Sequence, residues 1–121
     1  MQMKLRWGLV GYGDLAGKRV APALREVTGS QLVGVWGRSP EKTAAFARQH
    51  SIPDAHPTLC SLLQAELDVV YVCTPPDSHA EYALAAIAAG KHVLVEKPMA
   101  ATVADCEKMI RAARAQGVTL G

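Results

Sequence analysis

The 121-residue chain has few aromatic residues, so its core must be built mainly from Ala, Val, Leu and Ile. It also has few cysteines and no long apolar run, and each of these two scarcities excludes a class of protein. The three cysteines, Cys60, Cys73 and Cys106, are scattered and form no C-x-x-C pair, which argues against a disulfide-stapled fold. The longest apolar run, Tyr82 to Ala89, is far shorter than the roughly 20 residues of a membrane-spanning helix. We therefore expect no membrane span.

A strong net charge is also lacking. Thirteen Lys and Arg residues against eleven Asp and Glu residues leave +2, and the basic residues are dispersed, so we expect no nucleic-acid partner. The first residues are interrupted by charges and lack the apolar core of a secretory signal. With an odd number of cysteines, which suits reduced thiols, this predicts a cytoplasmic protein. No pattern of His or Cys residues indicates a metal site.

What the chain has is apolar content and a regular alternation. Half of its residues are hydrophobic, and its length suits one domain. Apolar runs of strand length alternate with segments of helical periodicity, without a linker or repeat. We expect strands at 5–10, 31–36, within 52–57, at 68–73, 92–95 and 118–120, and helices at 15–28, 40–49, 58–64, 78–89 and from Thr102 or Asp105 to 116.

This alternation predicts an α/β fold of the Rossmann type, a doubly wound parallel sheet between two layers of helices, spanning residues 1–121 as one domain. Local signals refine it. Pro22 lacks a backbone N–H and predicts a kink or break in the first helix. Ser78 and Glu81 have the spacing of a capping box, and Gly117 is placed to end the last helix.

A glycine-rich turn follows the first strand. Gly11, Gly13 and Ala16 match the pattern G-x-G-x-x-A of dinucleotide-binding proteins. In that pattern the first glycine permits a tight turn, the second lets a pyrophosphate approach the backbone, and the third small residue lets helix and strand pack closely. The strand before it and the helix after it are the context that the pattern requires. The candidate cofactor-binding residues of the turn are Gly11, Tyr12, Gly13, Asp14, Leu15 and Ala16; the alternative is a turn without a ligand.

The end of the second strand bears on the choice of coenzyme. NAD usually requires an Asp or Glu there to bind the adenine ribose, and this chain has Gly37, Arg38 and Ser39 instead. A guanidinium can bind a 2′-phosphate bidentately and a serine hydroxyl can add a donor. We therefore favour NADP(H) over NAD(H). The alternative is that Arg38 stacks on the adenine or faces solvent.

Two later segments carry a more specific pattern. Thr74-Pro75 with His79 follows one apolar strand, and Gly90-Lys91-His92 leads through the next strand to Glu96-Lys97-Pro98. Together with the glycine turn, these segments closely resemble the N-terminal domain of the Gfo/Idh/MocA oxidoreductases. That family includes glucose–fructose oxidoreductase, inositol dehydrogenase and many sugar and dihydrodiol dehydrogenases. The resemblance covers essentially the whole chain.

The residues themselves also place chemistry after these strands. Open parallel sheets bind ligands at the carboxyl ends of their strands, near the point where the strand order reverses. Pro98 favours an extended backbone at Lys97, and an ammonium there could stabilise an alkoxide that develops during hydride transfer. The resemblance implies this catalytic role for Lys97; the alternative is a solvated loop lysine.

The resemblance implies further roles around the cofactor. Thr74, Pro75 and His79 match positions that line its ribose and nicotinamide side, and Glu96, Lys97 and Pro98 complete the expected cofactor-binding set. A cis Lys97–Pro98 peptide bond is also expected. His79 has an alternative reading as a first-turn helix residue.

The resemblance finally implies an NAD(P)-dependent oxidoreductase that transfers hydride between a nicotinamide and a secondary alcohol or carbonyl of a sugar, polyol or diol. Family members carry a second domain with a His general base, and we expect this chain to end at that domain seam. We expect the 121-residue piece to bind its cofactor without turnover. Exposed apolar surface favours a homodimer. The alternative is a stand-alone dinucleotide-binding or sensor module.

Overall fold

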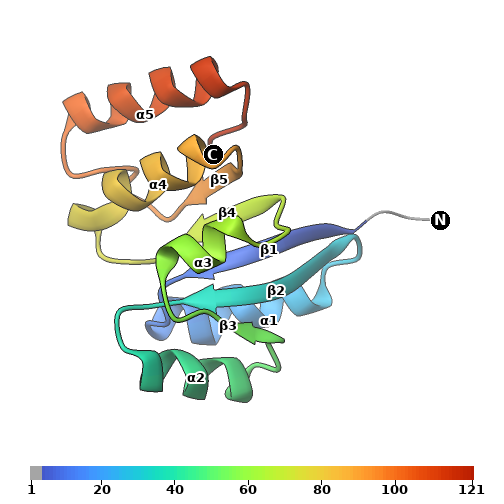
Figure 1. Ribbon diagram of the computed structural model, residues 1–121. Helices are drawn as coiled ribbons and strands as arrows, with labels where there is room; N and C mark the ends of the chain where they lie inside the picture. The colour runs from blue at the N-terminus through green and yellow to red at the C-terminus, as the bar shows by residue number, and fades with distance from the viewer. Residues whose placement is uncertain (1–3) are drawn as a thin grey trace.

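The structure, a computed structural model, describes residues 4–121 and is built on one parallel sheet (Figure 1). Its five strands lie in the order β3-β2-β1-β4-β5, and every neighbouring pair is parallel. The strands are β1 (Leu5–Val10), β2 (Ser30–Trp36), β3 (Asp54–Ala55), β4 (Val69–Val72) and β5 (His92–Val95). The predicted Rossmann-type sheet is confirmed, and its order reverses between β1 and β4.

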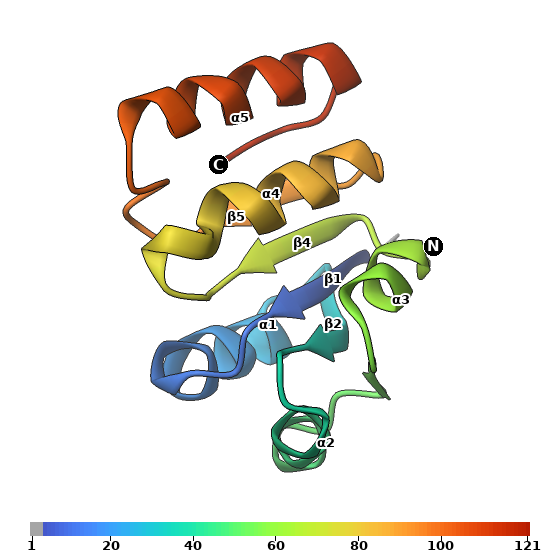
Figure 2. The same cartoon turned by 60° about the vertical axis from the view of Figure 1, so that its left-hand side comes forward.

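Helices cover both faces of this sheet. They are η1 (Ala16–Val20), α1 (Ala21–Glu26), α2 (Pro40–Gln49), α3 (Leu59–Gln64), η2 (Pro76–Ser78), α4 (His79–Ala88) and α5 (Val103–Gln116). Successive strand residues point to opposite faces. Leu9 packs with η1, α1 and α2, whereas Val10 packs with α3, α4 and α5. Figure 2 shows α5 lying along α4, on the outer side of that layer. Because helices pack on both faces of a parallel sheet, the fold is doubly wound, as predicted.

The first predicted helix is divided where proline interrupts it. Residues Ala16–Val20 form a π-helical turn in which the Ala21 N–H donates to the Ala16 carbonyl, five residues back. Pro22 then occupies the first turn of α1, where its missing N–H costs nothing. The helix ends at Glu26. The break predicted from Pro22 is confirmed. It takes the form of a change from π-helical to α-helical hydrogen bonding between Val20 and Ala21.

Helix caps follow the sequence in two cases and depart from it in one. Ser39 Oγ accepts a bond from the Lys42 N–H, and Thr102 Oγ1 accepts one from the Asp105 N–H, so Thr102 and not Asp105 opens α5. The predicted capping box at Ser78 is wrong. Ser78 Oγ lies 2.8 Å from both Thr74 Oγ1 and the Pro75 carbonyl. The single turn η2 takes the place of a side-chain cap.

The last residues run beside β5. Gly117 ends α5 in the left-handed conformation, with φ of 70°. Leu120 then pairs with Val93 in a parallel bridge, and backbone hydrogen bonds join Thr119 and Gly121 to β5. The strand predicted at 118–120 is therefore present only as this bridge. No helix within residues 4–121 is long and apolar enough to cross a membrane.

Candidate cofactor-binding site

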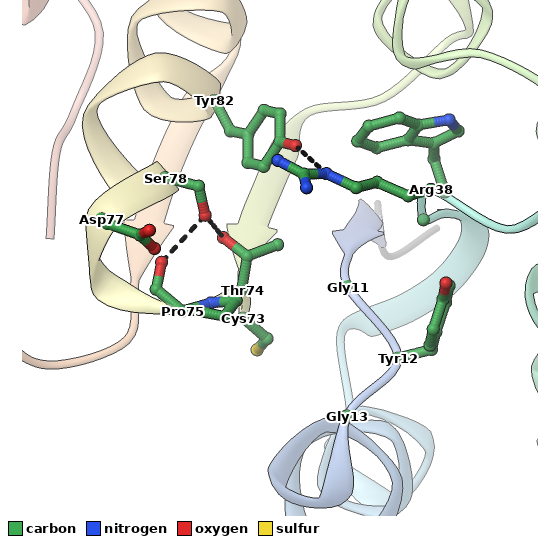
Figure 3. A pocket seen from close by; sticks show the side chains of 12 residues that line it. Gly11, Tyr12, Gly13, Arg38, Cys73, Thr74, Pro75, Asp77, Ser78 and Tyr82 are labelled. Carbon is green, nitrogen blue, oxygen red and sulfur yellow. Dashed lines mark hydrogen bonds between the residues drawn. The ribbon is translucent and has the colours of Figure 1, made fainter.

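A cavity of about 430 Å³ opens at the carboxyl ends of β1, β2 and β4 (Figure 3). This is where the strand order reverses and where open α/β sheets bind ligands. Its volume lies within the range of small-molecule sites. The lining residues come from the three strand ends and from the start of α4: Gly11, Tyr12, Gly13, Trp36, Gly37, Arg38, Cys73, Thr74, Pro75, Asp77, Ser78 and Tyr82.

The glycines of the first turn have different reasons to be glycine. Gly11 has φ of 107°, and a Cβ there would lie 3.0 Å from the Cys73 carbonyl oxygen. At Gly13, no atom beyond its own chain neighbours lies within 4 Å of the place where a Cβ would stand. Ala16 is fully buried in the cluster that contains Leu9. Gly11 is therefore needed by the fold, Ala16 packs helix against strand, and Gly13 leaves open space toward the cavity.

Tyr12 connects the glycine turn to the loop after β2. Its hydroxyl accepts a hydrogen bond of 3.0 Å from the Ser39 N–H. Its ring lies against Gly37 so closely that a Cβ on Gly37 would overlap it. The absence of a side chain at Gly37 therefore makes room for the Tyr12 ring. Asp14 and Leu15, the other two residues of this turn, are exposed and do not line the cavity.

Arg38 extends across the cavity from the loop after β2 and meets α4 (Figure 3). Its Nε donates to the Tyr82 hydroxyl at 3.4 Å. That hydrogen bond is the main reason why the pKa of Arg38 is raised above its ordinary value. The Tyr82 ring is 6% exposed and meets Trp36 edge to face, with centroids 5.5 Å apart. Ser39 caps α2 just beyond the cavity lining.

The loop after β4 forms the opposite wall. Thr74 and Pro75 line the cavity, and Ser78 holds Thr74 through its hydroxyl. Cys73 lies beside them. Burial, helped by the nearby Glu96 carboxylate, raises the pKa of the Cys73 thiol to about 12. Cys73 is therefore a neutral packing residue at physiological pH.

His79 lies beneath this wall and does not line the cavity. Its side chain is 1% exposed. Nε2 lies 2.6 Å from the Thr74 carbonyl oxygen, and Nδ1 lies 2.8 Å from the Pro98 carbonyl oxygen. Both partners are carbonyl acceptors that face the two ring nitrogens. His79 links the loop after β4 to the loop after β5.

The loop after β5 carries Glu96, Lys97 and Pro98 to the same edge of the sheet, outside the cavity lining. The Lys97–Pro98 peptide bond is cis, as expected. Glu96 Oε2 accepts a bond of 2.9 Å from the Tyr71 hydroxyl. Burial, followed by this bond, raises the pKa of Tyr71. Lys97 is exposed, and none of the ion pairs within residues 4–121 includes it. Its ammonium is available to a ligand.

Sequence reasoning missed five lining residues: Trp36, Cys73, Asp77, Ser78 and Tyr82. Trp36 and Cys73 end or follow strands at the same edge, so the strand assignments could have pointed to them. Tyr82 lies one helical turn after Ser78, a spacing that places both on one side of a helix. Of the expected cofactor residues, the ones outside the lining are Asp14, Leu15, Ala16, Ser39, His79, Glu96, Lys97 and Pro98. No group of His, Cys, Asp and Glu within residues 4–121 could hold a metal ion.

The strand order, the glycine turn at the reversal point and the cavity beside it define a dinucleotide-binding domain of the Rossmann type. The open space at Gly13 and the exposed guanidinium of Arg38 fit a phosphate-bearing dinucleotide. The chain belongs to the Gfo/Idh/MocA oxidoreductase family, whose model, described as an oxidoreductase family with an NAD-binding Rossmann fold, matches residues 5–121.

Relatives with assigned activities agree with this membership. The chain is 43% identical to 1,5-anhydro-D-fructose reductase of Ensifer adhaerens over 96% of this chain and 35% of that protein. It is 33% identical to the NADP(+)-dependent scyllo-inositol 2-dehydrogenase of Bacillus subtilis, again over 96% of this chain and 35% of that protein. The chain therefore spans about a third of the length of these relatives.

Solved structures share the fold as well. A 3-ketoreductase from Actinomadura kijaniata in complex with NADP superposes with a TM-score of 0.91 at 30% identity, covering 97% of this chain and 37% of that one. A biliverdin reductase from Synechocystis in complex with biliverdin and NADP+ superposes with a TM-score of 0.85 at 38% identity. The match covers 96% of this chain and 36% of that one.

Proposed function

We propose that this chain is the cofactor-binding part of an oxidoreductase that transfers a hydride between a nicotinamide and a secondary alcohol or carbonyl of a sugar, polyol or diol. The observation that carries the proposal is the placement of an exposed lysine, Lys97, on the sheet edge that holds the cavity beside the glycine turn. Relatives named as a reductase of 1,5-anhydro-D-fructose, a scyllo-inositol dehydrogenase and, in Sus scrofa, a trans-1,2-dihydrobenzene-1,2-diol dehydrogenase support this substrate class.

Different residues of this chain have different roles in binding and catalysis. The turn at Gly11 and Gly13 binds the pyrophosphate, and the walls at Arg38 and Thr74 hold the two ends of the dinucleotide. When bound, the nicotinamide supplies or accepts the hydride. Lys97 donates a hydrogen bond from Nζ to the substrate oxygen, and its positive charge stabilises the alkoxide character that develops there.

NADP(H) is the proposed coenzyme. No carboxylate follows β2, where NAD-binding domains usually carry one, and Arg38 lines the cavity at that point. A guanidinium attracts the 2′-phosphate, whereas a carboxylate would repel it. Two of the similar solved structures are described as complexes with NADP or NADP+, which supports the same choice.

The test of the catalytic assignment is Lys97→Met, a substitution that keeps length and removes charge. Coenzyme binding, measured by fluorescence titration of NADPH on this chain, should remain within about twofold of wild type, because Lys97 lies outside the cavity lining. Turnover of sugars, inositols or diols by the complete protein should fall by at least about 10²-fold, the scale of losing one stabilising donor.

Arg111→Met on α5 is the matched control, since it removes one exposed positive charge far from the sheet edge. Unchanged turnover in Lys97→Met would refute the catalytic role of Lys97. Failure of the wild-type chain to bind either coenzyme would refute the proposed function.

A further inference from the structure

Arg38 is held by a residue that the coenzyme patterns of the sequence do not point to. Its own loop follows β2, yet its guanidinium bonds to Tyr82 on α4, across the cavity (Figure 3). This hydrogen bond joins the two walls of the cavity and leaves the guanidinium exposed to ligand. The orientation of Arg38 therefore depends on a different element from the one that carries it.

Tyr82 is a rigid anchor. Its ring is 6% exposed, belongs to the core cluster under α4, and meets Trp36 at the end of β2 edge to face, at an interplanar angle of 78°. Tyr82 is nevertheless one of the residues that line the cavity. An arginine side chain loses rotamer freedom when it binds a ligand. Fixing Arg38 against a buried phenol beforehand removes part of that loss.

The bond also leaves the useful part of the guanidinium free. Arginine has five N–H donors in a planar fork, and Tyr82 takes the one on Nε. The two terminal nitrogens remain available for a bidentate contact with phosphate oxygens.

The partner of Arg38 is a phenol and not a carboxylate, and that matters for a dianionic ligand. Asp77 and Glu81 are near enough to raise the pKa of Arg38 slightly, behind the effect of Tyr82. Within residues 4–121, however, no carboxylate forms an ion pair with Arg38. A carboxylate partner would position the guanidinium and cancel its charge. A phenol positions it and leaves the positive charge for the ligand.

We propose that Tyr82 is a specificity-determining residue for NADP(H), acting by holding Arg38 in the orientation that binds the 2′-phosphate. The inference rests on the proposed use of NADP(H). NADH carries a hydroxyl in place of that phosphate, so its binding gains little from an oriented guanidinium.

The test is Tyr82→Phe, which removes the hydroxyl and keeps the ring against Trp36. The dissociation constant for NADPH should rise about 5- to 10-fold, the scale of a hydrogen bond that supports a charged contact. The constant for NADH should stay within about twofold, which also reports that the variant is folded. Arg38→Ala should remove the NADPH preference. Arg48→Ala at the far end of α2 is the control for loss of one positive charge.

The double variant Tyr82→Phe with Arg38→Ala separates positioning from direct contact. If Tyr82 acts through Arg38, the double variant should bind NADPH as Arg38→Ala does. A further loss of the same size on the Arg38→Ala background would overturn the positioning role, as would equal effects on NADPH and NADH or no effect at all.

A wild-type chain that binds both coenzymes equally would overturn the NADP(H) assignment and this inference with it. A wild-type preference that Arg38→Ala abolishes and Tyr82→Phe leaves intact would overturn this inference alone.

Discussion

At the scale of single residues, glycines in one motif do different work. Gly11 is required by the backbone, because its φ of 107° and the nearby Cys73 carbonyl exclude a side chain. A Cβ on Gly13 would meet no atom beyond its chain neighbours, so packing does not demand a glycine there. The motif in the sequence predicts both positions equally and cannot separate these reasons. The separation needs the distance to a strand that lies sixty residues further along the chain.

The pair Gly11→Ala and Gly13→Ala tests this division. Gly11→Ala should lower the free energy of unfolding by about 1–3 kcal/mol, the usual cost of a side chain in a disfavoured backbone region. Gly13→Ala should change it by less than about 0.5 kcal/mol but weaken NADPH binding strongly. Urea unfolding and coenzyme titration of both variants are the measurements. Equal destabilisation by the two substitutions would contradict the assignment.

His79 is a second residue whose role only the tertiary structure shows. The resemblance places it near the cofactor, and the structure gives its buried ring two part-buried carbonyl partners, on Thr74 and Pro98. His79→Phe removes the side-chain donor from these part-buried carbonyls and should lower the free energy of unfolding by about 1–3 kcal/mol in all. His79→Gln retains a side-chain N–H donor, so it should lower the free energy of unfolding by less than His79→Phe does. Urea unfolding of both variants measures these differences. A His79→Phe variant as stable as wild type would show that the His79 hydrogen bonds between the two loops do not stabilise the fold.

At the scale of elements, the sequence predicted strands and helices well because the apolar period and the turn residues agree. The strands at 5–10 and 92–95 have the predicted bounds, and Ser39 and Thr102 cap as their type suggests. Ser78 does not, because Thr74 and Pro75 compete for its hydroxyl. The predicted strand at 118–120 is a single bridge. Failures occur where a side chain has an alternative partner or where pairing depends on a distant strand.

A salt bridge between Arg6 and Asp68 also connects the two central strands, β1 and β4. Asp68, just before β4, accepts bonds from the Arg6 N–H and from its guanidinium, at the start of β1. These hydrogen bonds hold the pKa of Asp68 below its ordinary value of 3.8. A lowered folded-state pKa contributes stability above the unfolded pKa, and that contribution is lost as the pH falls through the folded one.

Asp68→Asn should therefore be less stable than wild type at pH 7, with the difference shrinking below about pH 4. Unfolding by urea at pH 7 and at pH 3 measures it. Glu66→Gln is the control, because that carboxylate is almost fully exposed and its pair with Arg6 is screened by solvent. A stability difference that stays constant or grows as the pH falls would exclude the proposed role of Asp68.

At the scale of the whole molecule, the fold gathers residues from distant segments at one sheet edge. Gly11, Arg38, Thr74 and Lys97 each follow a different strand, and parallel pairing brings these strand ends together. The sequence predicted this edge because each candidate follows an apolar run. It could not predict the contact between Arg38 and Tyr82, which depends on the packing of α4 against the sheet. The motifs therefore identify the site, and the packing determines how its side chains are held.

The central claim is that a nicotinamide dinucleotide binds at the carboxyl edge of the sheet, where the strand order reverses. Titration of the isotope-labelled chain with NADPH, followed by amide NMR shifts, tests it most directly. The account predicts saturable shifts at Gly11, Gly13, Arg38 and Thr74, with Asp68 and His92 at the opposite edge unmoved. Saturable shifts confined to that opposite edge, or no shift at millimolar NADPH, would contradict it.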